Sequence, residues 1–283
     1  MPRRPRTPPR AIHDRQGWAQ HFYDIMDVLK LESVRDRPRD TRSDAKYRRA
    51  LSKWLTDHQL DEIFSQTDAL SNAEKLRDHM SPVLKSEHAK IAIDASRWIV
   101  KQWGGIPTGL DAVAVWHKEC NQYNRGDVHE FVIKMAAKRI ASWSKILSFV
   151  DRQRYPIYDA RNGAALNSVL WEVGVKRYFP TVGTRNTRAD EAFKIMDRRM
   201  RRPHTLNYFD YSSLIEIIAR EHFRDGNILN AELSLFNASH RILDEFFVKE
   251  EELRKREKQR RLERKQPFIV RFDDDKNQGD LPL

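Results

Sequence analysis

"SKILSFVDRQRYPIYDARNGAALN", residues 144–167, is the stretch from which the fold of this chain is best predicted. An apolar helical run that carries Lys145 ends in the connector "DRQRYPIY", and helical spacing resumes directly after Asp159. Pro156 cannot continue a helix, and it favours an extended conformation at Tyr155. Asp159 is therefore expected at the N-cap of the second helix, where its carboxylate can accept hydrogen bonds from free backbone amides. Such a turn could fold the first helix back so that Lys145 and Asp159 face one cleft.

These two residues also fit a purely local role. Aspartate is a common helix N-cap, and lysines are common on exposed helix starts. The spacing of Lys145 and Asp159 by itself therefore leaves open whether they form a functional pair.

The rest of the sequence is helical in pattern almost throughout. Apolar spacing and the Gly and Pro breakers predict helices at residues 18–29, 44–57, 86–103, 110–122, 127–141, 142–150, 160–173, 188–200, 212–225 and 229–265. The Ser-x-x-Glu form of "SNAE", residues 71–74, predicts a further helix start. Only "PFIVRF", residues 267–272, has strand character. The expected fold class is all-α.

Changes in composition along the chain divide it into four regions. Residues 1–10, "MPRRPRTPPR", are expected to be a flexible, disordered basic arm. A helical N-terminal region follows at 11–84, then a core at 85–245, and a charged helix and tail at 246–283. The segment "EFFVKEEELRKREKQRRLERK" begins apolar and becomes wholly charged, which favours a helix whose second half projects into solvent. The alternative for its charged half is a basic arm on DNA.

Composition limits the class of protein and its partners. The 283 residues are 40% hydrophobic, which is typical of a globular protein, and carry a net charge of +11. A basic surface attracts polyanions such as nucleic acid, although a solvated mixed-charge surface is the alternative. No apolar run is long enough for a membrane span, and the N-terminus lacks the apolar segment of a secretory signal. The single Cys120 excludes a disulfide within the chain, so a reducing, cytoplasmic setting is expected.

The segment "WSKILSFVDRQRYPIYDARNGAAL" resembles the signature segment of the helix-hairpin-helix DNA glycosylase superfamily. It is most similar to bacterial proteins with an 8-oxoguanine-glycosylase fold. In that superfamily a lysine begins the second helix of the hairpin, and an aspartate after a Pro/Val-x-x-Asp pattern caps the next helix. Lys145 and Asp159 fall on these positions, and "IVKQWGGIP" (99–107) and "AELSLFNASHRI" (231–242) resemble the same bacterial proteins. The resemblance spans about 85–245 and implies a two-lobed, all-α fold.

Three features depart from the family pattern. The expected hairpin stretch, "RIASWSK", lacks the Gly-x-Gly turn whose amides approach a DNA phosphate, and the 14-residue spacing from Lys145 to Asp159 is about one helical turn shorter. There is no four-cysteine loop for an iron–sulfur cluster, and the histidines lack metal-ligand spacing. No cofactor and no metal are therefore expected.

The resemblance implies cleavage of the bond between a base and its deoxyribose. Asp159 would stabilise the positive charge that develops on the sugar and orient or deprotonate a water. Lys145 would either attack the anomeric carbon and form a Schiff base, or stay charged and hold the DNA backbone. We expect the second role, which makes the enzyme monofunctional.

The remaining candidate residues fall into two groups. Aromatic residues and glycines that could surround a flipped base are Trp98, Trp103, Gly104, Gly105, Tyr155 and Tyr158. Candidates for contact with DNA phosphates are Arg139, Ser142, Ser144, Arg152, Arg154 and Arg161. A place in the core is the alternative for each aromatic residue.

The expected partner is double-stranded DNA with a modified base, and no membrane. The "WGG" element and the abundant tryptophans favour a bulky, sugar-bearing base, since indole rings stack well on sugars. This points to defence against phage DNA that carries glucosylated hydroxymethylcytosine. Repair of an oxidised purine such as 8-oxoguanine is one alternative, and a non-catalytic DNA- or RNA-binding protein is another. The sequence does not predict the oligomeric state.

Overall fold

The computed structural model describes nine stretches of the chain. They are residues 18–33, 49, 61–63, 69–86, 88–107, 113, 128–200, 206–223 and 225–265, of which residues 49 and 113 are described singly. All regular elements within these stretches are helices, which confirms the all-α prediction for this part of the chain. The predicted arm at 1–10, the strand-like 267–272, and nearly all of the predicted helices at 44–57 and 110–122 lie outside the described residues.

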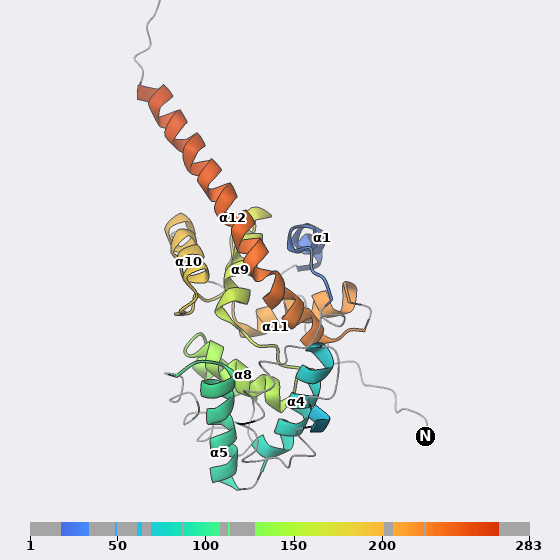
Figure 1. Ribbon diagram of the computed structural model, residues 1–283. Helices are drawn as coiled ribbons and strands as arrows, with labels where there is room; N and C mark the ends of the chain where they lie inside the picture. The colour runs from blue at the N-terminus through green and yellow to red at the C-terminus, as the bar shows by residue number, and fades with distance from the viewer. Residues whose placement is uncertain are drawn as a thin grey trace, which may run out of the picture. The chain divides into compact units, whose positions relative to one another are not determined.

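The helices follow one another along the chain (Figure 1). They are α1 (Trp18–Leu29), α4 (Ala69–Leu84), α5 (Ala89–Arg97), the π-helix η1 (Trp98–Trp103), α7 (Val128–Met135), α8 (Ile140–Val150), α9 (Ala160–Glu172), α10 (Thr187–Met200), α11 (Tyr208–Glu221) and α12 (Ile228–Lys265). None of the helices in the described stretches is long and apolar enough to span a membrane.

Several predicted helix boundaries are wrong. The helix predicted at 212–225 is α11, Tyr208–Glu221, which begins and ends four residues earlier. The "SNAE" stretch does not start a helix, because Ala69 and Leu70 are already helical within α4. The predicted helix at 127–141 ends early, since the chain enters the left-handed region at Ala136 (φ 45°) and again at Arg139 (φ 58°). These two residues lie in the turn between α7 and α8, which begins at Ala136 and ends at Arg139, the first residue of the "RIASWSK" stretch.

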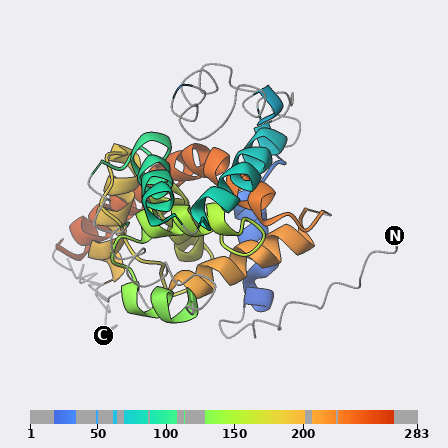
Figure 2. The ribbon, with the colours of Figure 1, turned by 90° about the horizontal axis from the view of Figure 1, so that it is seen from below.

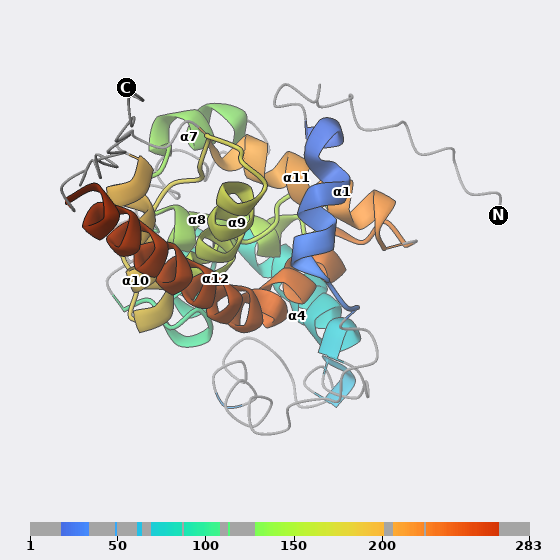
Figure 3. The same cartoon turned by 90° about the horizontal axis from the view of Figure 1, so that it is seen from above.

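Helices α8 and α9 occupy the interior of the fold. Every residue of α8 from Ser142 to Val150 is buried, and so is nearly all of α9 from Asn162 to Leu170. A helix that is buried on all sides needs neighbours on all sides. Figure 2 shows α4 crossing α8, and Figure 3 shows α9 between α1 and α10. The connector 151–159, which joins α8 to α9, therefore runs through the protein between two sets of packed helices.

Contacts divide the chain into two compact units, and the boundary falls inside α12. The first unit ends at Asp244 and the second begins at Glu245. In the second unit, residues 254–264 are exposed, as expected for the charged half of this helix. Its turns are linked by ion pairs at four-residue spacing, including Glu250 with Arg254 and Glu251 with Lys255.

Candidate functional site

Two tyrosines of α11 hold the connector by its carbonyl groups. The Tyr208 hydroxyl donates to the Pro156 carbonyl at 2.7 Å, and the Tyr211 hydroxyl donates to the Ile157 carbonyl at 2.7 Å. Burial raises the pKa of the Tyr211 hydroxyl well above its ordinary value, so it remains a donor at physiological pH. These bonds satisfy carbonyl groups that an extended, buried segment cannot pair within itself.

The amide groups of the connector are held by α12 and α8. The Ile157 amide donates to Glu232 Oε2 at 2.8 Å, and the Tyr158 amide donates to Ser144 Oγ at 3.0 Å. Hydrogen bonds from three separate helices thus fix the backbone immediately before Asp159. A side chain on a backbone held in this way is preorganised, which is what a catalytic group requires.

Asp159 caps α9, as the sequence predicted. Its Oδ1 accepts a hydrogen bond from the Arg161 amide at 2.9 Å. Two cations lie beside the carboxylate: Lys145 Nζ is 3.6 Å from Oδ2, and Arg161 Nε is 3.5 Å from Oδ1. The Asp159 side chain is 24% exposed, whereas that of Lys145 is 6% exposed. The predicted pair therefore meets, with the carboxylate on the more open side.

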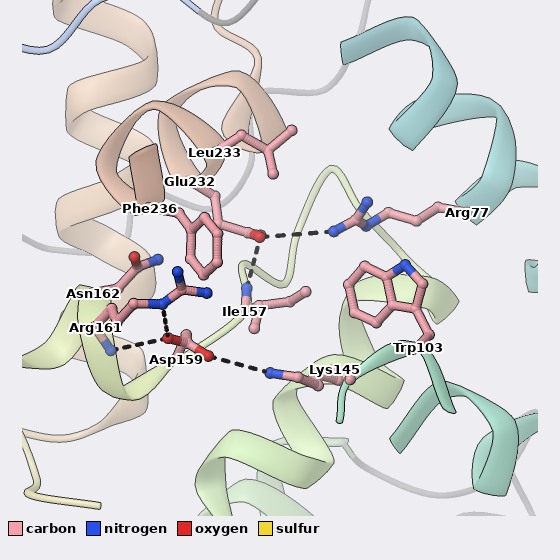
Figure 4. A pocket seen from close by; sticks show the side chains of 11 residues that line it. Arg77, Trp103, Lys145, Ile157, Asp159, Arg161, Asn162, Glu232, Leu233 and Phe236 are labelled. Carbon is pink, nitrogen blue, oxygen red and sulfur yellow. Dashed lines mark hydrogen bonds and ion pairs between the residues drawn. The ribbon is translucent and has the colours of Figure 1, made fainter. Parts of the chain in front are cut away.

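Lys145 and Asp159 line a cavity of about 310 Å³ (Figure 4). This volume lies at the lower end of the range for ligand pockets. Its wall is formed by Arg77, Trp103, Gly104, Lys145, Ile157, Asp159, Arg161, Asn162, Glu232, Leu233 and Phe236. The aromatic rings of Trp103 and Phe236 give it flat apolar surfaces between the charged groups.

The π-helix brings Trp103 and Gly104 to the cavity. The Gly104 amide donates to the Ile99 carbonyl at 2.8 Å, five residues back, which is the hydrogen bond that defines a π-turn. A Cβ atom on Gly104 would lie 2.7 Å from Lys145 Cδ. The glycine thus allows η1 to lie directly against the aliphatic stem of the lysine.

A second ion pair lies in the same cavity. Arg77 Nη2 is 3.7 Å from Glu232 Oε1, and the guanidinium lies 5.4 Å from the centre of the Trp103 ring. Arg77 is 1% exposed and Glu232 is 4% exposed. Burial raises the pKa of the Glu232 carboxyl, and the positive charge of Arg77 opposes this shift. Burial also lowers the pKa of Arg77.

Four residues predicted to surround a flipped base do not line the cavity. Trp98 is 2% exposed and belongs to the core. Tyr155 is buried as well, and Tyr158 is fully buried with its hydroxyl donating to the Pro180 carbonyl at 2.6 Å. Gly105 has a φ of 65° and ends the π-helix. For these four residues a structural role in the core or in the turn replaces the predicted contact with a base.

The predicted phosphate contacts of two serines do not fit the structure. Ser142 is 2% exposed and Ser144 is fully buried, since α8 lies in the interior and is not exposed at its N-terminal end. Ser144 instead accepts the hydrogen bond from the Tyr158 amide. Ser144 thereby positions the connector.

The four predicted arginines have different surroundings. Arg152 forms ion pairs with Glu74 at 2.7 Å and Asp78 at 2.8 Å, so its charge is already neutralised within the protein. Arg139 and Arg154 are exposed, where they can meet a polyanion. Arg161 lies in the cavity wall with its guanidinium 3.5 Å from the centre of the Phe236 ring. Only Arg139 and Arg154 keep the exposure that a phosphate contact needs.

Six cavity residues were missed by reasoning from the sequence: Arg77, Ile157, Asn162, Glu232, Leu233 and Phe236. A signal was present for two of them. Glu232 is the one charged residue in the run "ILNAELSLF", and Arg77 shares helical spacing with the buried Met80. A charged residue on an apolar helix face is rare unless it is paired. Phe236 gave no signal, because an aromatic residue on such a face is ordinary.

The charged groups of the cavity form two pairs, Lys145 with Asp159 and Arg77 with Glu232, and Arg161 adds a further cation. The described stretches contain no group of three or more histidine, cysteine, aspartate or glutamate side chains that could hold a metal ion. No protein-family model, curated protein or solved structure matches this chain. A fixed carboxylate, buried cations and aromatic walls can bind a planar polar ligand and stabilise a positive charge that develops on it.

Proposed function

We propose that this protein is a DNA glycosylase that removes a modified base from double-stranded DNA and leaves an abasic site. The observation that carries this proposal is the Lys145–Asp159 pair, 3.6 Å apart, in the wall of a cavity that also presents Trp103 and Phe236. A base that leaves the stack needs a pocket with aromatic or apolar walls and a few polar groups. The net charge of +11 supports binding to a polyanion.

Asp159 is the proposed catalytic carboxylate. As the bond between base and sugar breaks, positive charge develops on the sugar, and a carboxylate at a fixed position stabilises it without reorganisation. The same carboxylate can take a proton from the attacking water. The connector supports this role, because its amides donate to Ser144 and Glu232 and its Ile157 carbonyl accepts from Tyr211, which holds the backbone before Asp159.

Lys145 is proposed to assist by holding Asp159 and the nucleotide. Its side chain is 6% exposed and lies in the cavity wall, which favours contact with the flipped nucleotide over a grip on the DNA backbone. Water then hydrolyses the bond, and the enzyme leaves an intact abasic site.

The proposed substrate is glucosylated hydroxymethylcytosine in phage DNA, and the proposed setting is the cytoplasm. Trp103 supports it, because an indole face in the cavity can stack on a sugar. An oxidised purine such as 8-oxoguanine is the second candidate. The volume of about 310 Å³ favours it, since a base without an attached sugar needs less space.

The proposal is tested by an assay for abasic sites. The wild-type protein is incubated with glucosylated phage DNA, with the same DNA lacking glucose, and with duplexes that contain 8-oxoguanine. Asp159→Asn should abolish base release, whereas Asp151→Asn is the matched control. Asp151 lies in the same connector but outside the cavity wall, and its carboxylate accepts a hydrogen bond from the Gln153 amide. Binding of DNA without release of any base would support the non-catalytic alternative.

A further inference from the structure

The Arg77–Glu232 pair has hydrogen-bonding capacity that the described protein does not use. Arg77 Nε donates to Ser148 Oγ at 3.1 Å and Nη1 donates to the Ala73 carbonyl at 3.2 Å. Its Nη2 is buried and has no hydrogen-bond acceptor among the described residues. Glu232 uses Oε2 for the Ile157 amide, and the contact of its Oε1 is the 3.7 Å approach of Arg77 Nη2. One donor and one acceptor therefore lie side by side in the cavity wall.

As a purely structural feature, such an arrangement would lower the stability of the fold. Two charges removed from water are stabilised fully only when good geometry and hydrogen bonds replace their hydration. Here the two atoms that face each other are separated by more than a hydrogen-bond distance. The remaining polar atoms of Arg77 and Glu232 are bound to Ser148, Ala73 and Ile157, which fixes the pair in place.

The two ion pairs occupy different parts of the cavity. Figure 4 shows Arg77 and Glu232 on one side of Ile157, and Lys145 and Asp159 on the other. The residues Ile157 and Asp159 are two positions apart, and two extended residues span at most about 7 Å. The spacing of these two backbone positions is comparable to the distance across one nucleoside, from the sugar carbon to the far edge of the base.

We propose that Arg77 and Glu232 read the hydrogen-bonding edge of the base whose sugar faces Asp159. The inference rests on the proposed glycosylase function. Glu232 Oε1 accepts a hydrogen bond from an N–H of the base, and Arg77 donates to the acceptor atom beside it. The ligand is thus a planar base with an N–H next to a ring nitrogen or a carbonyl oxygen, stacked between Trp103 and Phe236.

The chemistry of the pair sets this specificity. An ionised carboxylate only accepts hydrogen bonds, and a guanidinium only donates them. A base whose edge nitrogen carries methyl groups in place of all its hydrogens leaves Glu232 Oε1 without a donor and places a carbon against a buried charge. A buried polar group left unpaired is the strongest basis that a pocket has for rejecting a close analogue.

Equilibrium binding to uncleaved DNA tests the inference. In Asp159→Asn protein, affinities are measured for duplexes that contain 8-oxoguanine, 5-hydroxymethylcytosine or a tetrahydrofuran abasic analogue. The same measurements use 1-methyl-8-oxoguanine and the N4,N4-dimethylated counterpart of 5-hydroxymethylcytosine. Glu232→Gln is then added, because glutamine keeps an oxygen for the Ile157 amide and changes the chemistry of the atom that faces Arg77. Glu74→Gln is the matched control, since Glu74 lies on α4 and pairs with Arg152 of the connector but is not part of the cavity wall.

The expected result has two parts. With Glu232 present, at least one of the two bases binds ten times or more tighter than its edge-methylated counterpart, and with Glu232→Gln this ratio falls to about one. The affinity for the tetrahydrofuran duplex changes less than twofold, and Glu74→Gln alters neither quantity. Arg77→Lys, as a second variant, should lower the affinity for the base and leave the affinity for the tetrahydrofuran duplex unchanged.

Other outcomes overturn the inference and separate it from the proposed function. If the ratio of affinities for the unmethylated and the methylated base is the same with glutamate and with glutamine at position 232, Glu232 does not read the base, even where the wild-type protein excises it. A parallel loss of affinity for all duplexes, tetrahydrofuran included, would assign Glu232 only to the support of the connector. If wild-type protein releases no base and Asp159→Asn protein does not distinguish base-containing from tetrahydrofuran duplexes, the proposed function itself fails and the inference fails with it.

Discussion

Gly104→Ala isolates the close packing of the π-helix on Lys145. Gly104 has φ −80° and ψ −10°, a conformation that alanine adopts without strain. The cost of the substitution in the folded protein is therefore steric. The new Cβ would lie 2.7 Å from Lys145 Cδ and 2.8 Å from the Ile99 carbonyl oxygen.

Two effects of opposite sign decide the stability of this variant. Alanine reduces the conformational entropy of the unfolded chain, which stabilises a protein by about 0.4–1 kcal/mol when the native backbone is compatible. Overpacking of a closed site costs about 1–3 kcal/mol. The Lys145 stem can move, but the Ile99 carbonyl is held by its hydrogen bond from the Gly104 amide. Overpacking should therefore exceed the entropic gain, and the free energy of unfolding should fall by about 1–2 kcal/mol.

Movement of Lys145 should also lower the rate of base excision. A shift of about 1 Å in a positioned group can cost about 100-fold in rate. Urea unfolding and the abasic-site assay measure the two effects. Gly183→Ala is the matched control, because a Cβ at Gly183 would meet nothing within 4 Å. If Gly104→Ala is as stable and as active as Gly183→Ala, the packing of Gly104 on Lys145 has no part in the site.

Four further predictions concern the charged residues. Asp159→Asn should change the free energy of unfolding by less than about 1 kcal/mol, because asparagine caps helices as well as aspartate does; a larger loss in urea unfolding would show that the ion pairs matter more than the cap. DNA binding should weaken by orders of magnitude between about 50 and 200 mM salt, and a flat titration would contradict binding through phosphates. Borohydride should trap no covalent adduct with DNA, whereas an adduct that maps to Lys145 would show that its amine attacks the sugar. Because burial raises the pKa of Glu232 above 4.5, folded protein retains this proton where the unfolded chain has lost it. The stability of the wild type relative to Glu232→Gln should therefore fall as the pH rises from 4.5 through the folded-state pKa, and a difference that stays constant in urea unfolding across this range would refute the assignment.

Features that depend on neighbouring residues could be predicted from the sequence. Pro156 interrupts the helical pattern, and the spacing that resumes after Asp159 requires a cap at that position. Trp103 marks the end of a helix because two glycines follow it. In each case the signal and the structure it specifies lie within a few residues of each other.

Tertiary packing changed several local predictions. The helical pattern at 127–141 is broken at Ala136 and Arg139, although neither residue is a glycine. Ser142 and Ser144 looked available to DNA, yet α8 lies in the interior and buries them. Secondary-structure preference is weak enough for packing of this kind to override it.

The sequence by itself determined an all-α chain with Asp159 at a helix start and Lys145 in the helix before it, because these follow from local spacing. Only the tertiary structure decided that the two side chains meet at 3.6 Å in a cavity, and that Arg77 and Glu232 meet in the same cavity. Arg77 lies on α4 and Glu232 on α12, so no periodic pattern links them. Their contact depends on how α4, α8 and α12 pack around the connector, which is a sum of many weak, long-range contacts that no short stretch of sequence encodes.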